Sequence, residues 1–183
     1  MKRRNFLLTT AAIVPVIAMG QDSKPQAERG KKGFVVKSTE SRFNEKTALG
    51  GTSPNDIKIS SKDTNGDLTV FEYTGNEKGG PPLHVHANQD EIFFILSGEY
   101  LFQVGDDRHN LKAGDTIFLP RKVPHAFAQL TDKGKMFFLF QPSGKMEDFF
   151  RILGALSGPP TPEAGAKIFH DHDMEVVGPP LQV

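Results

Sequence analysis

Two histidines and a glutamate lie within eight residues of one another in this sequence of 183 residues. His84 and His86 are two positions apart, so their side chains leave the same face of an extended strand. Glu91 follows a short polar turn and opens an apolar run that ends at Gly98, a pattern that indicates a buried strand. If the two strands pair, two imidazoles and a carboxylate meet at one point. This donor set suits a divalent first-row metal ion.

His125 is available as a fourth ligand further along the chain. The segment before it runs from a turn at Gly114 through a predicted strand to Pro120. Pro120 and Pro124 lack the amide hydrogen that a sheet ladder requires, so we expect a loop or bulge between them. His125 then begins the next strand, which can lie beside the first motif if the chain folds as a jelly roll.

The elements around these residues are predicted to be short strands separated by turns. Close spacing of the segments, Gly and Pro between them and little helical periodicity favour an all-β sandwich or barrel. Residues 145–156 are the exception, with an apolar stripe that predicts a short amphipathic helix. Besides the two strands of the histidine motif, we expect extended segments at residues 34–38, 56–60, 68–74, 100–104, 108–111, 116–119, 126–130 and 136–140.

Composition limits the chemistry and the partners. Basic and acidic residues balance at 22 each, and no basic block follows the extreme N-terminus, which excludes nucleic acid as an expected partner. The sequence has no Cys, so disulfides, thiolate ligands and cysteine nucleophiles are excluded together. A bound metal would therefore be held by His and carboxylate side chains. The length favours one domain.

The N-terminus carries the pattern of an export signal. Arg3 and Arg4 precede an apolar run over residues 6–19 that is too short for a comfortable membrane span. Small residues ahead of Gln21 offer a cleavage site. The paired arginines also match the twin-arginine signal, while an ordinary secretory signal is the alternative. Either route predicts a periplasmic or extracellular protein with no stable membrane anchor after processing.

The two histidine motifs together resemble those of the cupin superfamily. Histidine-x-histidine, four residues, glutamate, six residues and glycine resembles the first cupin motif. Glycine, five residues, proline and a histidine five positions later resembles the second. The stretch Gly-Gly-Pro-Pro-Leu-His-Val-His is similar to single-domain cupins grouped with quercetin 2,3-dioxygenases. The resemblance implies a double-stranded β-helix, or jelly-roll barrel, with metal ligands at His84, His86, Glu91 and His125.

Three positions depart from the family pattern. Lys78 and Lys122 stand where glycines are usual, and Gln129 stands where asparagine is usual. These positions shape turns and the contacts around the ligands, so the ligand set itself is unaffected.

The resemblance further implies a dioxygenase that oxidises an aromatic or enediol-type small molecule with O₂. Glu91 would then act as a catalytic base as well as a ligand. The ligand set accepts iron, manganese, nickel, cobalt or copper, and zinc also fits. Two alternatives use the same site: a barrel that binds a metal and a small ligand without catalysis, and a metal-dependent isomerase or lyase that needs no O₂.

The chain is predicted to divide into an export signal (1–20), a flexible lead-in (21–32), a cupin barrel (33–145) and a C-terminal helix with an extension (146–183). Exposed sheet faces predict a homodimer. His109 is expected to be solvent-exposed. Residues 170–173, His-Asp-His-Asp, could form a second metal site, but an irregular solvated loop is the favoured interpretation.

Overall fold

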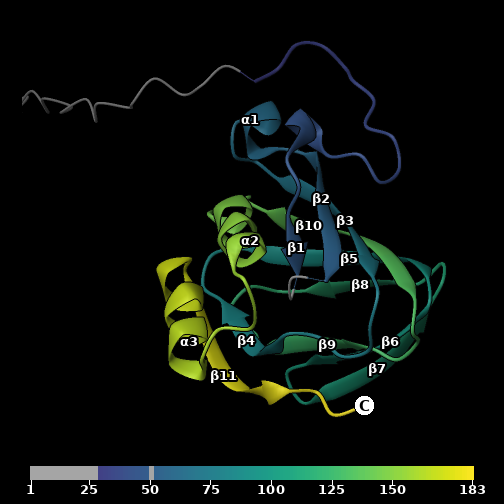
Figure 1. The fold of residues 1–183 in the computed structure, drawn as a ribbon, viewed down its shortest axis with the longest axis vertical. Coiled ribbons are helices and arrows are strands. Elements are labelled where there is room, and N and C mark those ends of the chain that lie inside the picture. Colours follow the sequence, from purple (N-terminus) through teal and green to yellow (C-terminus); the bar gives the residue numbers. More distant parts are fainter. Residues whose placement is uncertain (1–28, 50–51) are drawn as a thin grey trace, which may run out of the picture.

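The structure, a computed structural model, describes residues 29–49 and 52–183. The predicted export signal and most of the lead-in lie outside the described residues. Two antiparallel sheets face each other and enclose the core (Figure 1). The six-stranded sheet has the order β1 (Ala48–Leu49), β2 (Ser53–Ile59), β3 (Thr69–Gly75), β10 (Gly134–Gln141), β5 (Asp90–Ser97) and β8 (Thr116–Leu119). The five-stranded sheet has the order β11 (Met174–Pro180), β4 (Pro82–His86), β9 (His125–Gln129), β6 (Glu99–Val104) and β7 (Asp107–Lys112). The predicted all-β jelly roll is confirmed.

Alternation along the strands places aromatic rings between the sheets. Phe93 and Phe94 are neighbours on β5, so their side chains leave opposite faces of the sheet. Phe93 is buried, and Phe94 has 41% of its surface exposed. Phe138 on β10 stacks against Phe93 and against Phe71 of β3, with ring centroids 5.2 and 5.1 Å apart. These contacts connect three strands of one sheet through the interior, where burial of aromatic surface contributes most of the stabilisation.

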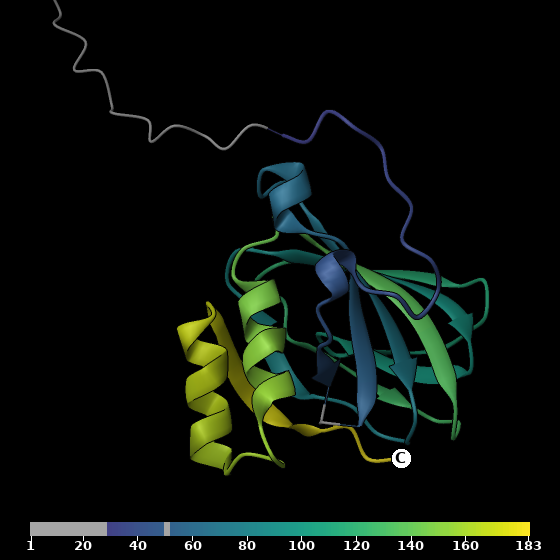
Figure 2. The ribbon, with the colours of Figure 1, turned by 45° about the horizontal axis from the view of Figure 1, so that its top comes forward.

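Two helices cover one flank of the barrel. The predicted helix is confirmed as α2 (Met146–Ala155), and α3 (Pro162–Asp171) lies beside it (Figure 2). Two shorter helices, η1 (Arg42–Asn44) and α1 (Ser61–Thr64), flank β2. No helix in the described part of the chain is both long enough and apolar enough to cross a membrane.

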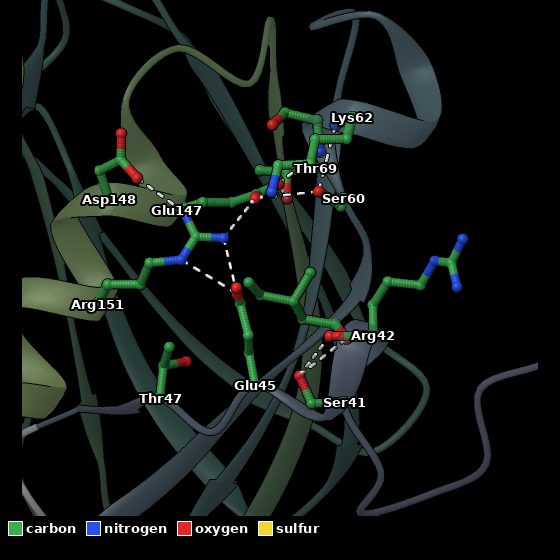
Figure 3. A network of polar contacts seen from close by, with 12 residues as sticks. Ser41, Arg42, Glu45, Thr47, Ser60, Lys62, Thr69, Glu147, Asp148 and Arg151 are labelled. Carbon is green, nitrogen blue, oxygen red and sulfur yellow. Dashed lines mark hydrogen bonds and ion pairs between the residues drawn. The ribbon is translucent and has the colours of Figure 1, made fainter. Parts of the chain in front are cut away.

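A buried carboxylate attaches α2 to the six-stranded sheet. Glu147 accepts hydrogen bonds from Ser60 Oγ at 3.0 Å and Thr69 Oγ1 at 2.9 Å. Glu147 also accepts the backbone amide of Ser61 and pairs with Arg151, one helical turn further. Arg151 in turn binds Glu45 at 2.7 Å (Figure 3). Helix, sheet and N-terminal segment are thereby joined through one polar network.

The C-terminal region differs from its prediction. We expected one helix followed by an extension, with an irregular loop at residues 170–173. Instead, α3 continues to Asp171, and β11 joins the five-stranded sheet as the neighbour of β4. The prediction for residues 34–38 is also corrected. They were expected to form an extended strand, and they form none.

Candidate metal centre

The four predicted ligands converge inside the barrel. One ligand atom from each of His84, His86, Glu91 and His125 lies within 4.8 Å of the others, and all four residues are buried. The histidines come from β4 and β9 of the five-stranded sheet, whereas Glu91 comes from β5 of the six-stranded sheet. The cluster therefore bridges the two sheets.

Strand register explains how the three imidazoles meet. His84 on β4 is paired directly with His125 on β9, so their side chains share a face, and their ring centroids are 4.7 Å apart. The alternation of β4 returns His86 to the same face, where its ring lies nearly parallel to that of His125 at 5.3 Å. Glu91 completes the group with Oε2 at 3.8 Å from Nε2 of His86.

Two of the imidazoles have their tautomer set by the backbone. Nδ1 of His84 lies 2.8 Å from the carbonyl oxygen of Pro82, and Nδ1 of His125 lies 3.0 Å from that of Val123. Because a carbonyl oxygen only accepts, both Nδ1 atoms carry the hydrogen. Nε2 of each ring is then a free lone pair, which is the form that binds a metal.

Unpartnered nitrogens at the cluster support this assignment. Nε2 of His86 and Nε2 of His125 are buried and have no hydrogen-bond partner among the described residues. Buried polar atoms without partners are rare in folded proteins, so such a group requires an explanation. A cation at the centre of the four side chains would satisfy both nitrogens, and the buried set of three histidines and one glutamate fits a divalent metal site.

Burial also shifts the pKa values of the ligands. It lowers the pKa of His84 to about 3, with a further contribution from the neighbouring His125. Burial likewise lowers the pKa of His86 well below its usual value. The imidazoles of His84 and His86 are therefore neutral at pH 7 and need not lose a proton to bind a metal. Burial raises the pKa of Glu91, although the nearby imidazole of His125 opposes the change.

The remaining histidines lie elsewhere. His109 on β7 is exposed, as predicted. His170 is exposed on α3, whereas His172 is buried just beyond the helix, with Nδ1 2.7 Å from the carbonyl oxygen of Ile168. Across residues 29–49 and 52–183, the barrel cluster is the one group of three or more potential ligands. The second metal site is therefore not found there.

A cavity of about 280 Å³ opens onto the cluster, and its walls are mainly apolar. Phe127 and Phe138 of the barrel line it, together with Phe149 and Phe150 of α2 and Phe169 of α3. Sequence reasoning did not identify the helical part of this wall. The apolar stripe of residues 145–156 was the available signal, but it does not say which surface the helix covers.

Comparison with known proteins agrees with the fold. Residues 70–141 match the profile of the family described as "Cupin domain". An uncharacterized protein of Methanocaldococcus jannaschii is 42% identical over 43 residues, covering 24% of this chain and 34% of that protein. A quercetin 2,3-dioxygenase of Bacillus subtilis is 27% identical over 106 residues, covering 58% of this chain and 31% of that protein. The chain thus spans about a third of the length of these two curated relatives.

The solved structures include KdgF from Halomonas sp., which superposes with a TM-score of 0.52 at 16% identity, covering 61% of this chain and 94% of that one. This likeness concerns the fold alone. Together with the family match, it confirms the resemblance read from the two motifs. Residues 70–141 are therefore similar to a cupin domain, and the chain has the fold of the cupin barrel.

Proposed function

We propose that this protein is a metal-dependent dioxygenase that oxidises an uncharged aromatic or enediol-type small molecule with O₂. The observation that carries the proposal is the apolar cavity that ends on the buried group of His84, His86, Glu91 and His125. The similarity to a quercetin 2,3-dioxygenase over 58% of this chain supports the same reaction class. A divalent ion held by these four residues would supply Lewis-acid and redox chemistry.

The walls of the cavity favour an uncharged guest. Besides Glu91, its charged lining residues are Glu77 and Lys78, which are exposed and opposite in sign. No arginine lines it within the described residues. A carboxylate or phosphate group deep in this cavity would therefore lack a cationic partner from the protein, which buried anions require. Aromatic side chains instead offer stacking and edge contacts to a planar ring.

Glu91 is suited to take a proton from the substrate. Its carboxylate is buried and lines the cavity, and burial raises its pKa above the usual value. A carboxylate with a raised pKa is a stronger base toward an enol or phenol hydroxyl. A substrate that fills this aromatic-lined cavity would displace water from Glu91, so the deprotonated substrate would be protected from competing protonation.

Metal analysis and oxygen uptake test the proposal. Protein purified without chelator should contain a divalent metal, and reconstitution with iron, manganese, nickel, cobalt, copper or zinc should identify the active ion. An oxygen electrode then records O₂ consumption with a panel of flavonols and catechols. Turnover under nitrogen would instead show an isomerase or lyase. Binding of a panel compound with no turnover under either gas would show a non-catalytic binding protein.

Export is part of the same proposal and is supported by the N-terminal sequence. Mass spectrometry of the protein from its native host should give a chain that begins near Gln21. An intact chain that retains Met1 in the cytoplasmic fraction would contradict it.

A further inference from the structure

Gln89 is buried beside the metal centre. It follows His86 by three residues in the turn between β4 and β5, and only 2% of its surface is exposed. Its Oε1 has no hydrogen-bond partner in the described part of the chain. A buried amide oxygen without a donor is costly, typically by about 1–3 kcal/mol, so its surroundings should contain the missing partner.

Nδ1 of His86 likewise lacks a hydrogen-bond partner among the residues that the structure describes. The other two histidines of the centre, His84 and His125, each use Nδ1 to contact a backbone carbonyl two residues earlier. Nδ1 of His86 has no such contact with any described residue and is buried. Because Nε2 of His86 lies on the side of Glu91, at 3.8 Å from its Oε2, Nδ1 is on the opposite edge of the ring, away from the centre.

The two side chains are close enough to influence each other. Burial is the main cause of the lowered pKa of His86, and the side chain of Gln89 opposes this lowering. The pair does not meet the distance and angle of a full hydrogen bond.

Gly144 leaves the space in which the nitrogen end of the Gln89 amide lies. A Cβ atom at residue 144 would lie 2.1 Å from Nε2 of Gln89, so the nitrogen end of the amide packs against this glycine. Gly144 has φ of +53°, a backbone conformation that favours glycine in any case. With Nε2 placed there, Oε1 is the end of the amide that remains for His86.

We propose that Gln89 is the positioning residue for His86: its Oε1 accepts the Nδ1 hydrogen and thereby directs Nε2 toward the metal. This inference rests on the metal centre of the proposed function. It gives all three imidazoles the same Nδ1-protonated tautomer, two through backbone carbonyls and one through a side chain. Such outer contacts typically change metal affinity by about 10–100-fold when they are removed.

Cobalt titration of the metal-free protein, in competition with a chelator of known affinity, tests the role of Gln89. Gln89→Met fills a similar volume but offers no strong acceptor, so Co²⁺ affinity should fall about 10–100-fold and the visible absorption of the cobalt complex should change. Gln89→Glu keeps an acceptor and should restore affinity to within about tenfold of the wild type. Asn88→Ala, an exposed neighbour in the same turn, is the matched control and should bind Co²⁺ normally.

The tautomer of His86 provides a readout that does not need the metal. Long-range ¹H–¹⁵N spectra of the metal-free protein should show His86 protonated at Nδ1 in the wild type and a mixture of tautomers in Gln89→Met. Unchanged spectra together with unchanged Co²⁺ affinity in Gln89→Met would overturn the proposal. If the wild type bound no Co²⁺, the proposed function would fail, while the tautomer populations would still decide for or against the role of Gln89.

Discussion

The carboxylate of Glu91 faces the imidazole of His125 across the barrel, with Oε2 3.2 Å from Nε2. The hydrogen of His125 is on Nδ1, which contacts the carbonyl of Val123, so Nε2 presents a lone pair to a carboxylate oxygen. Two acceptors at this distance attract each other only through a proton or a cation between them. Since Glu91 and His125 belong to different sheets, a metal at this point would connect the two halves of the barrel.

Metal binding should therefore stabilise the fold. At a free metal concentration one hundred times the dissociation constant, linkage gives about 2.7 kcal/mol. For a domain of this size, that corresponds to a rise in Tm of about 5–10 °C. Calorimetry with and without Mn²⁺ or Co²⁺ measures the shift, and His125→Ala should abolish it. Equal Tm values for the wild type in chelator and in excess metal would contradict the prediction.

Replacement of Glu91 should separate metal content from turnover. Glu91→Gln leaves three imidazoles in place, and its amide oxygen still ligates weakly, so a substantial share of the metal should remain. The amide cannot accept the substrate proton, so turnover should fall by roughly a hundredfold or more. Alanine at His84, His86 or His125 should instead remove most metal and activity together. Near-normal turnover in Glu91→Gln, measured per bound metal, would show that Glu91 is not the base.

Local patterns in the sequence predicted His84, His86 and Glu91 as a ligand set and offered His125 as a candidate, and the resemblance to the cupin motifs assigned all four. Side-chain alternation placed His84 and His86 on one face, and two prolines placed a loop before the strand that His125 begins. The structure confirms both expectations, with a loop at residues 120–124. These features depend on residues a few positions apart, which is why one sequence is enough to predict them.

The C-terminal elements could not be predicted in the same way. Prolines and glycines in residues 158–165 indicate a break, yet Thr161 caps α3 by accepting the amide of Ala164, and Pro162 occupies the first turn, where its missing amide hydrogen is not needed. Pro180 looks unsuited to a sheet, but β11 lies at an edge and its pairing with β4 shifts register before that residue.

Tertiary contacts also determine the conformation of residues 34–38. Its composition favours an extended strand, but the carbonyl oxygen of Lys37 accepts a hydrogen bond from Nζ of the buried Lys58 at 2.7 Å. Just beyond the segment, Oε1 of Glu72 accepts the backbone amide of Thr39 at 2.9 Å. Such contacts, between residues 20 to 35 positions apart, leave no periodic signal in the sequence. The packing of α2 and α3 against the cavity leaves no such signal either.

The network around Glu147 should contribute measurably to stability. Glu147→Ala removes the acceptor of the buried hydroxyls of Ser60 and Thr69, and should lower the free energy of unfolding by about 2–4 kcal/mol. Asp148→Ala is the control, because Asp148 also pairs with Arg151, at 2.7 Å, but is mostly exposed. It should cost about 0.5 kcal/mol or less. Equal urea-unfolding midpoints for the two variants would contradict this assignment.

The metal-free protein should lose stability as the pH falls below about 6.5, the usual pKa of histidine. Burial holds the pKa of His84 near 3 and that of His86 well below its usual value, so the folded state keeps both rings neutral while the unfolded chain binds protons. Stability then falls by up to about 1.4 kcal/mol per pH unit for each histidine.

Urea unfolding between pH 7.5 and pH 5 measures this slope. The double variant His84→Asn, His86→Asn should show a flatter dependence, because both titrating groups are gone. The raised pKa of Glu91 acts in the opposite direction between its usual value and its higher value in the folded protein, and it contributes in both proteins. The range stops at pH 5 so that the other carboxyl groups remain ionised. Equal slopes for the wild type and the double variant would contradict the prediction.

The homodimer expected from the sequence can be tested on the outer face of the six-stranded sheet. Phe94 and Leu96 of β5 expose 41% and 44% of their surfaces, and Phe118 of the edge strand β8 exposes 55%. Phe118 is paired with Ile92, so all of these side chains lie on the same outer face. Contiguous exposed apolar side chains of this kind are typical of a surface that binds another protein, and a second copy of the chain would cover them.

Light scattering at micromolar concentration should give twice the chain mass for the wild type and the monomer mass for Phe118→Glu, because burying an unpaired carboxylate in the contact is costly. Ile152→Glu is the matched control: Ile152 on α2 is 42% exposed, but it lies outside the sheet face. It should remain dimeric. A monomeric wild type would refute the dimer, and dissociation by Ile152→Glu but not by Phe118→Glu would place the contact on the helix instead of the sheet.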